Sequence, residues 1–200
     1  MRGRDRILGR VREALEGRER PEHPGHFEGW RPEAVERTPL DQLTSMLEAA
    51  GAEVVHLSGT NSAGVWLRRF AMDFESVTIG VTVPHVLRPA ISTRGAHEAA
   101  LGISMARAAI AETGSLVMSA RDGRKSQLLA PTHVVFVRAE DVHVTFRDAL
   151  LAIRSELPSA IGLHSGPSKS ADIAQTLVTG VHGPGRLVCV VVDEPAASAT

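Results

Sequence analysis

Short, continuously apolar runs alternate with helical patterns along this chain, and they leave few folds open. The clearest runs are HVVFV at residues 133–137 and RLVCVVV at residues 186–192. They are apolar at almost every position, whereas a strand with one face in water alternates apolar and polar residues. Strands that are buried on both faces are typical of parallel sheets with helices on each side. We therefore expect an α/β protein, a three-layer α/β/α sandwich around a mainly parallel sheet.

The other predicted elements continue this alternation. We expect strands at residues 53–57, 77–79, 103–111 and 116–119, and helices at residues 4–16, 38–51, 61–70, 96–101 and 146–157. The helix of residues 38–51 is the best marked, because Thr38 can cap it, Pro39 suits its first position and Gly51 ends it.

One stretch lacks any such pattern and divides the chain. Residues 17–37 are rich in Pro, Gly, His and charged residues and have no period. We therefore expect an N-terminal helix and extended arm over residues 1–37, followed by one α/β domain over residues 38–200.

Composition narrows the classes of partner. The formal net charge is −1, aromatic residues make up 4% and Tyr is absent. The chain thus offers neither the basic field nor the stacking platform of a nucleic-acid-binding protein. No apolar run reaches the roughly 20 residues of a membrane span, and no apolar segment of a secretory signal follows the first residues. We expect a cytoplasmic protein with no membrane span.

Two turn-rich segments near the last apolar run are candidates for a binding site. Residues 165–173 read SGPSKSADI and residues 180–185 read GVHGPG. Gly and Pro set unusual turns and let backbone N–H groups approach a ligand, and hydroxyls, amides and a lysine suit an anion. The match to the Walker phosphate loop fails, because the first Gly of that loop is absent. The candidate ligand-binding residues here are Ser165, Gly166, Ser168, Lys169, Asp172, His182 and Gly183.

A second candidate lies between two apolar runs, at Glu112-Thr113-Gly114-Ser115. A carboxylate in this setting can act as a nucleophile, as a base or as the partner of a basic group. Glu112 is therefore a candidate catalytic residue, and the three residues after it are candidate ligand contacts. The alternative is that Glu112 caps a turn or accepts from buried backbone amides, and the spacing alone favours that structural role.

Lys125 and His133 complete the candidate ligand-binding set. Lys125 stands in a polar stretch just ahead of His133, and beside the Lys169 segment it could form the second half of an anion pocket. Taken by itself, this stretch is explained as a solvated loop. The spacing of the His residues and of the single Cys189 matches no metal site, and the Gly-x-Gly-x-x-Gly fingerprint is missing. The sequence therefore predicts neither a metal nor a bound cofactor.

Four stretches taken in order resemble the LUD-domain family, and in particular its short lactate-utilization protein C (LutC/YkgG) type. They are AIAETGSLV at residues 109–117, PTH at 131–133, SGPSKSADI at 165–173 and GVHGP at 180–184. The resemblance covers roughly residues 38–193, and only the ordered set is specific. Ser115 and Lys169 depart mildly from it, since the family leads us to expect Thr and Arg there.

This resemblance implies a fold like that of the NagB/RpiA/CoA-transferase group, whose members bind CoA esters, sugar phosphates or folates. It also implies a role in a three-protein system that oxidises L-lactate to pyruvate, in which the other two proteins carry iron–sulfur cysteines. With one Cys, this chain would bind no cluster itself. It would act as an accessory subunit with iron–sulfur partner proteins and a small anionic metabolite. The alternative is a free-standing enzyme on an acyl-CoA, carboxylate or phosphorylated metabolite, with Glu112 catalytic.

Overall fold

A computed structural model describes residues 3–18, 37–171 and 177–194, without the side chains of Ala171 and Leu177. The chain divides into two units, residues 1–36 and 37–200. The first unit contains helix α1 (Gly3–Leu15), where the sequence predicts a helix at residues 4–16. Within the described residues, no helix is long and apolar enough to cross a membrane.

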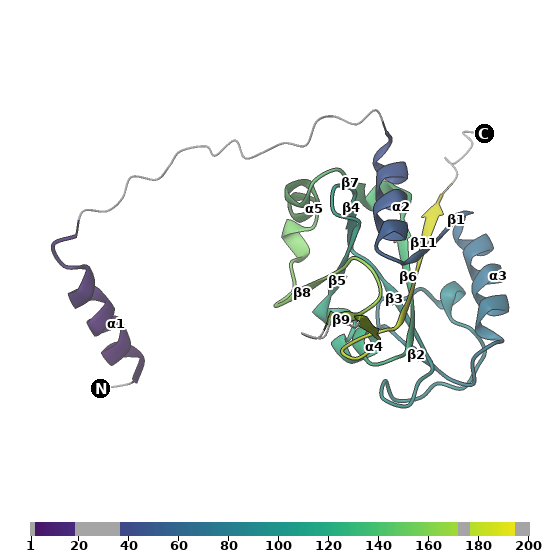
Figure 1. Ribbon diagram of the computed structural model, residues 1–200, viewed down its shortest axis with the longest axis horizontal. Helices are drawn as coiled ribbons and strands as arrows, with labels where there is room; N and C mark the ends of the chain where they lie inside the picture. The colour runs from purple at the N-terminus through teal and green to yellow at the C-terminus, as the bar shows by residue number, and fades with distance from the viewer. Residues whose placement is uncertain (1–2, 19–36, 172–176, 195–200) are drawn as a thin grey trace. The chain divides into compact units, whose positions relative to one another are not determined.

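A five-stranded sheet, parallel throughout, forms the centre of the second unit (Figure 1). Its strand order is β1 (Glu53–Ser58), β11 (Arg186–Asp193), β6 (Thr132–Arg138), β3 (Leu101–Met105) and β2 (Val77–Ile79). The two apolar runs are the adjacent strands β6 and β11, and all their inner residues are buried. Burial on both faces thus accounts for their unbroken apolar sequence.

Helix α3 (Thr60–Ala71) covers one face of this sheet together with the short 3₁₀ helix η1 (His85–Leu87). Leu67 of α3 packs into one cluster with Phe136 of β6 and Val190 of β11. Trp66 adds an edge-to-face contact with Phe136, with 6.5 Å between ring centroids. Aromatic and branched side chains thus join α3 to the middle of the sheet.

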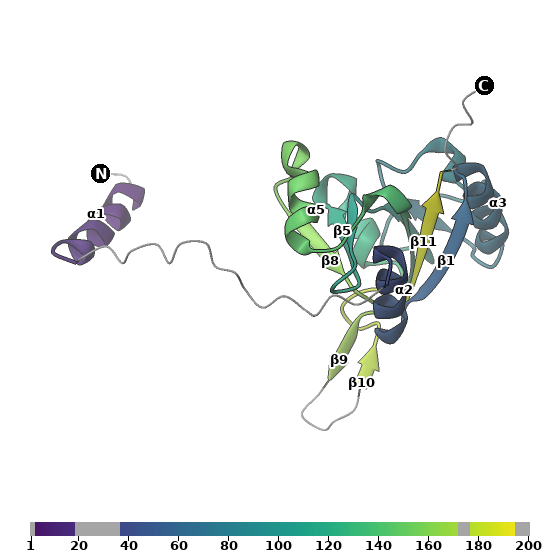
Figure 2. The ribbon, with the colours of Figure 1, turned by 90° about the horizontal axis from the view of Figure 1, so that it is seen from above.

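The opposite face carries α2 (Pro39–Ala49) and a second sheet. In α2, Leu43 and Leu47 are fully buried against Val135 of β6 and Cys189 of β11. The second sheet has the order β7 (Val142–His143), β4 (Ala108–Ile110), β5 (Ser115–Ser119) and β8 (Ile161–His164). Helix α5 (Phe146–Ala152) packs on it. Figure 2 shows α3 on one side of β1 and β11 and α2 on the other. The expected three-layer α/β/α architecture with a mainly parallel sheet is confirmed.

Shorter elements connect these layers. They are η2 (Ala120–Asp122), α4 (Arg124–Leu128), η3 (Ala139–Asp141), η4 (Arg154–Glu156) and the antiparallel hairpin of β9 (Lys169–Ala171) and β10 (Leu177–Thr179). The predicted capping of α2 is confirmed, because Thr38 accepts a hydrogen bond from the backbone N–H of Asp41 at 3.1 Å.

Two predicted elements are wrong in type or extent. The helix expected at residues 96–101 is absent, and Leu101 instead begins β3, where it pairs with Thr132. The single strand expected at residues 103–111 is two strands in different sheets, with Ala106 and Arg107 between β3 and β4. Both strands are buried, and an apolar run does not show where the chain passes from one buried sheet to the next.

Two helices differ at their ends. Helix α3 begins at Thr60, one residue before the expected start, and follows Gly59, whose φ of 77° suits glycine. The helix that starts at Phe146 ends at Ala152, and the 3₁₀ helix η4 continues the apolar spacing as far as residue 156. Because 3₁₀ and α turns place side chains on nearly the same face over a few residues, the pattern alone does not separate them.

Candidate functional site

The two segments singled out in the sequence, residues 112–115 and 165–169, lie against each other. The side-chain oxygen of Ser115 is 2.7 Å from that of Ser165 and 2.8 Å from that of Thr113. The pairing of β5 with β8 brings them together, since Leu116 stands opposite His164. Three hydroxyls therefore form one hydrogen-bonded chain. A ligand-binding role for them stays a prediction.

Glu112 makes a structural contact. Its carboxylate accepts a hydrogen bond from the backbone N–H of Phe146, the first residue of α5, at 2.8 Å. Thr145 caps the same helix by accepting from the N–H of Asp148 at 3.1 Å. The first N–H groups of a helix have no partner within it, so a carboxylate from another loop stabilises this end. The contact is the structural role that the spacing favours, and catalysis by Glu112 stays a prediction.

Lys169 contacts the C-terminus of a helix. Its ammonium group donates to the backbone carbonyl of Ala50, which follows the last residue of α2. Carbonyls at a helix C-terminus are unpaired and carry partial negative charge, so a lysine there is favourable. Gly166 approaches the same residue: a Cβ at Gly166 would lie 3.0 Å from the carbonyl oxygen of Ala50. This segment therefore closes over the end of α2.

The two turn-rich segments also meet. The N–H of Ser168 donates to the carbonyl of Pro184 at 2.8 Å, and the N–H of Gly180 donates to the carbonyl of Ser168 at 2.9 Å. A Cβ at Gly183 would lie 3.2 Å from the Cβ of Ser168. The expected grouping of Ser168 with residues 180–185 is thus present, and backbone hydrogen bonds hold it.

His133 is fully buried near the start of β6. Its Nε2 is 3.0 Å from the hydroxyl of Ser104, and its Nδ1 has no hydrogen-bond partner among residues 3–18, 37–171 and 177–194. The ring of His164 lies edge-on, with 5.9 Å between centroids. Burial, together with the neighbouring His164, lowers the pKa of His133 to about 3, and burial also lowers the pKa of His164. Both rings are therefore neutral at pH 7.

The remaining candidates are dispersed. Lys125 is exposed on α4, and His182 is exposed in the turn before β11. Asp172 lies outside the described residues. Within the described ranges, no three His, Cys, Asp or Glu side chains converge as a metal site requires.

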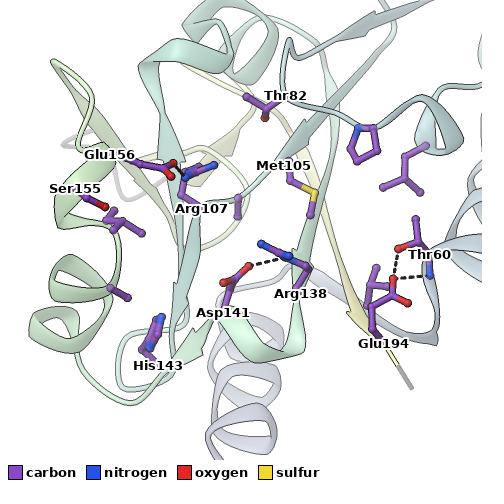
Figure 3. A pocket seen from close by; sticks show the side chains of 16 residues that line it. Thr60, Thr82, Met105, Arg107, Arg138, Asp141, His143, Ser155, Glu156 and Glu194 are labelled. Carbon is purple, nitrogen blue, oxygen red and sulfur yellow. Dashed lines mark hydrogen bonds and ion pairs between the residues drawn. The ribbon is translucent and has the colours of Figure 1, made fainter. Parts of the chain in front are cut away.

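A pocket opens at the other end of the central sheet, where the parallel strands finish (Figure 3). Its volume is about 460 Å³. In α/β sheets, ligands bind outside the carboxyl ends of the strands. The residues that line it are Thr60, Thr82, Pro84, Leu87, Met105, Ala106, Arg107, Arg138, Asp141, His143, Ala152, Ile153, Ser155, Glu156, Val192 and Glu194.

The charged groups of this pocket are held in ion pairs and hydrogen bonds. Arg107 pairs with Glu156 of η4, and Arg138 pairs with Glu140 at 3.1 Å and with Asp141 at 2.9 Å. Across the pocket, the carboxylate of Glu194 accepts from both the N–H and the hydroxyl of Thr60. Figure 3 shows Arg107 with Glu156, Arg138 with Asp141, and Glu194 with Thr60 around the pocket.

A buried carboxylate supports the pocket wall. Asp122 is 1% exposed, and one of its oxygens accepts from the N–H and the hydroxyl of Thr82 at 2.7 and 3.0 Å. The other oxygen accepts from the N–H of Met105 at 3.4 Å. Gly80 permits this approach, since a Cβ there would lie 2.3 Å from the carboxylate. Asp122 thus fixes the loop after β2 to the end of β3.

Among the residues that the structure describes, none of the site candidates from the sequence lines this pocket. Arg107 and Arg138 were missed because the first lies inside what reads as one long strand and the second ends another. The signal that could have found them is position: both stand at or just after the carboxyl end of a central strand, where α/β proteins bind ligands.

Comparisons with known proteins agree with the resemblance in sequence. The profile of the LUD domain matches residues 92–192. Lactate utilization protein C of Geobacillus kaustophilus is 32% identical over 124 residues, or 56% of this chain and 52% of that protein. Lactate utilization protein C of Shouchella clausii is 30% identical over 175 residues, or 78% of this chain and 74% of that protein.

The chain matches only part of several relatives, and its fold matches that of a solved structure. For several of these relatives the match spans about half of the relative's length. A crystal structure of a DUF162 family protein from Deinococcus radiodurans has a TM-score of 0.60 to this chain at 20% identity, and the match covers 77% of this chain and 96% of that one. At that identity the likeness concerns the fold alone. Profile, relatives and fold agree, and this chain belongs to the LUD-domain family, to the type that includes lactate utilization protein C.

Proposed function

We propose that this chain serves lactate utilization as an accessory subunit, working with iron–sulfur partner proteins that oxidise L-lactate to pyruvate. The observation that carries the proposal is the name lactate utilization protein C, shared by relatives from several bacteria, one of which matches 78% of this chain. In this proposal the LUD domain has the same role in lactate utilization here as in those relatives.

The chemistry of the reaction supports an accessory role. Oxidation of lactate to pyruvate releases two electrons and two protons, so some group must accept the electrons. Iron–sulfur clusters are held by several Cys thiolates, and this chain has one Cys. Cys189 is buried in the middle of β11, and burial raises the pKa of its thiol to about 12. In this proposal the cysteines that hold the clusters therefore belong to the partner proteins.

A small anionic metabolite is the ligand that we propose for the subunit. The hydroxyls of Ser115 and Ser165 are 2.7 Å apart, and Lys169 follows four residues after Ser165. The alternative, a free-standing enzyme with Glu112 catalytic, gains less support, because the Glu112 carboxylate already accepts from the α5 backbone. For that alternative to hold, Glu112→Gln would have to abolish activity in protein that is still fully folded.

The test is an assay with purified proteins. The chain alone, L-lactate and an artificial electron acceptor should give no pyruvate, whereas addition of the co-purified cysteine-rich partners should restore turnover. A pull-down from lactate-grown cells, analysed by mass spectrometry, should identify those partners. Robust pyruvate formation by the isolated chain would overturn the accessory role, and so would full activity of the partners in its absence.

A further inference from the structure

The pocket at the carboxyl ends of the central strands, the carboxyl-end pocket, has no role in the proposal above. Its geometry indicates a role of its own. We propose that this pocket binds an anionic organic ligand that is larger than lactate and carries a carboxylate or phosphate group, with Arg107 as the anchor. The inference is independent of the role in lactate utilization, because the pocket can bind such a ligand whether or not the chain contributes to lactate oxidation.

The size of the pocket suits a ligand larger than lactate. Its volume of about 460 Å³ corresponds to roughly 15 water molecules at about 30 Å³ each. It falls within the range of roughly 300–1,000 Å³ that is typical of sites for drug-sized ligands. Lactate has six non-hydrogen atoms and would leave most of this space to water. A ligand that fills the pocket is therefore several times larger.

The donors of the pocket are paired with carboxylates of the chain itself: Arg107 with Glu156, Arg138 with Asp141, and the N–H of Thr60 with Glu194. The lining residues that the structure describes thus hold two guanidinium groups and three carboxylates. Guanidinium groups bind carboxylate and phosphate in the same two-pronged geometry. An anionic ligand therefore binds by taking the place of one of the chain's own carboxylates.

Arg107 is the better anchor of the two arginines. Its side chain is 36% exposed and pairs with one carboxylate, whereas that of Arg138 is 52% exposed and pairs with two. Figure 3 shows the Arg107 side chain beside Glu156 at the wall of the pocket. Glu156 is itself 59% exposed, and such surface pairs contribute little free energy. Exchange of Glu156 for a ligand oxygen therefore costs little.

The frame around the anchor is rigid. Arg107 is the second residue after β3, and its own N–H donates to the carbonyl of Val117 in β5 at 2.8 Å. The buried carboxylate of Asp122 ties Thr82 to the end of β3. The backbone that carries Arg107 is thus fixed before a ligand binds, which favours affinity.

Isothermal titration calorimetry of the full chain at low salt tests the proposal, with citrate as the carboxylate probe, glucose 6-phosphate as the phosphate probe and L-lactate as the small comparison. At least one of the larger probes should bind saturably and more tightly than L-lactate. Arg107→Gln should weaken that binding about tenfold or more, because a charge-assisted hydrogen bond is lost. Glu156→Gln should strengthen it by up to about fivefold, because it frees Arg107. Arg124→Gln, at an exposed arginine on α4, is the matched control.

A second variant keeps the test valid if the charge changes disturb folding. Ala152 is exposed and lines the pocket, so Ala152→Trp should block binding without any change of charge, whereas Ala90→Trp, at an exposed loop position outside it, should not. The proposal is overturned if neither larger probe binds, if L-lactate binds as tightly as they do, if Arg107→Gln and Arg124→Gln have equal effects, or if Ala152→Trp leaves binding intact. The two larger probes separate a carboxylate ligand from a phosphate ligand.

Discussion

The buried His133 should make the stability of this protein depend steeply on pH. Its pKa is about 3 in the folded chain, against 6.5 for an unperturbed histidine. The unfolded state therefore binds a proton at a pH where the folded state binds none. The contribution of neutral His133 to the free energy of unfolding is present above pH 6.5. It is lost as the pH falls below 6.5, and the loss ends near pH 3. The two pKa values give a loss of about 2 kcal/mol between pH 7 and pH 5, and about 1 kcal/mol more by pH 4.

Urea unfolding at pH 7, 6 and 5 measures this loss, and His133→Gln isolates it. Glutamine keeps an amide near Ser104 but does not titrate, so its unfolding free energy should fall by about 2 kcal/mol less between pH 7 and pH 5. The readout is the slope of the unfolding free energy against pH, so a loss of stability that the variant already shows at pH 7 does not affect it. Parallel slopes for the two proteins would refute the reasoning. If the variant does not fold, NMR of the wild-type His133 ring decides, since the ring should stay neutral down to pH 5.

Four further predictions follow from single contacts. Gly114→Ala should lower the free energy of unfolding in urea by about 2–4 kcal/mol, because φ is +61° and the new Cβ would lie 2.6 Å from the Cβ of a residue in α2. The control Gly185→Ala, where a Cβ has ordinary contact distances, should lower it by less than about 1 kcal/mol. Asp122→Ala should cost about 3 kcal/mol by the same assay, since it leaves three donors without their acceptor. Lys169→Ala should cost about 0.5 kcal/mol, the scale of a cation at a helix C-terminus; a fall in affinity for an anionic probe with unchanged stability would instead support ligand binding by this lysine. Removal of residues 1–36 should leave the urea midpoint of the remaining chain unchanged, and loss of cooperative unfolding would show that the core needs them.

The sequence predicted most accurately where local chemistry decides the structure. Thr38, Pro39 and Asp41 carry the signals of a helix start within four residues, and α2 begins there. The two apolar runs predicted two core strands, because parallel strands are buried on both faces. In both cases a few neighbouring residues contain the whole signal.

Prediction failed where long-range pairing decides. Nothing between residues 103 and 111 marks the passage from the central sheet to the second one, because both strands are equally buried. The carboxyl-end pocket combines residues that follow β1, β2, β3, β6 and β11, and their strand order is known only from the fold. Arg107 and Arg138 belong to no motif, so their proximity leaves no trace in the sequence.

The residues with the most recognisable pattern make contacts that explain them without a ligand. Glu112 accepts from the first N–H of α5, and Lys169 donates to a carbonyl at the end of α2. Helix ends expose four unpaired groups each, and in a fold of buried strands the short polar loops must satisfy them. Such residues therefore change stability when they are replaced, and lost activity in their variants says little by itself. A binding role at this end of the sheet requires a loss of affinity larger than the loss of stability, whereas the exposed pair of Arg107 and Glu156 allows the two effects to be separated directly.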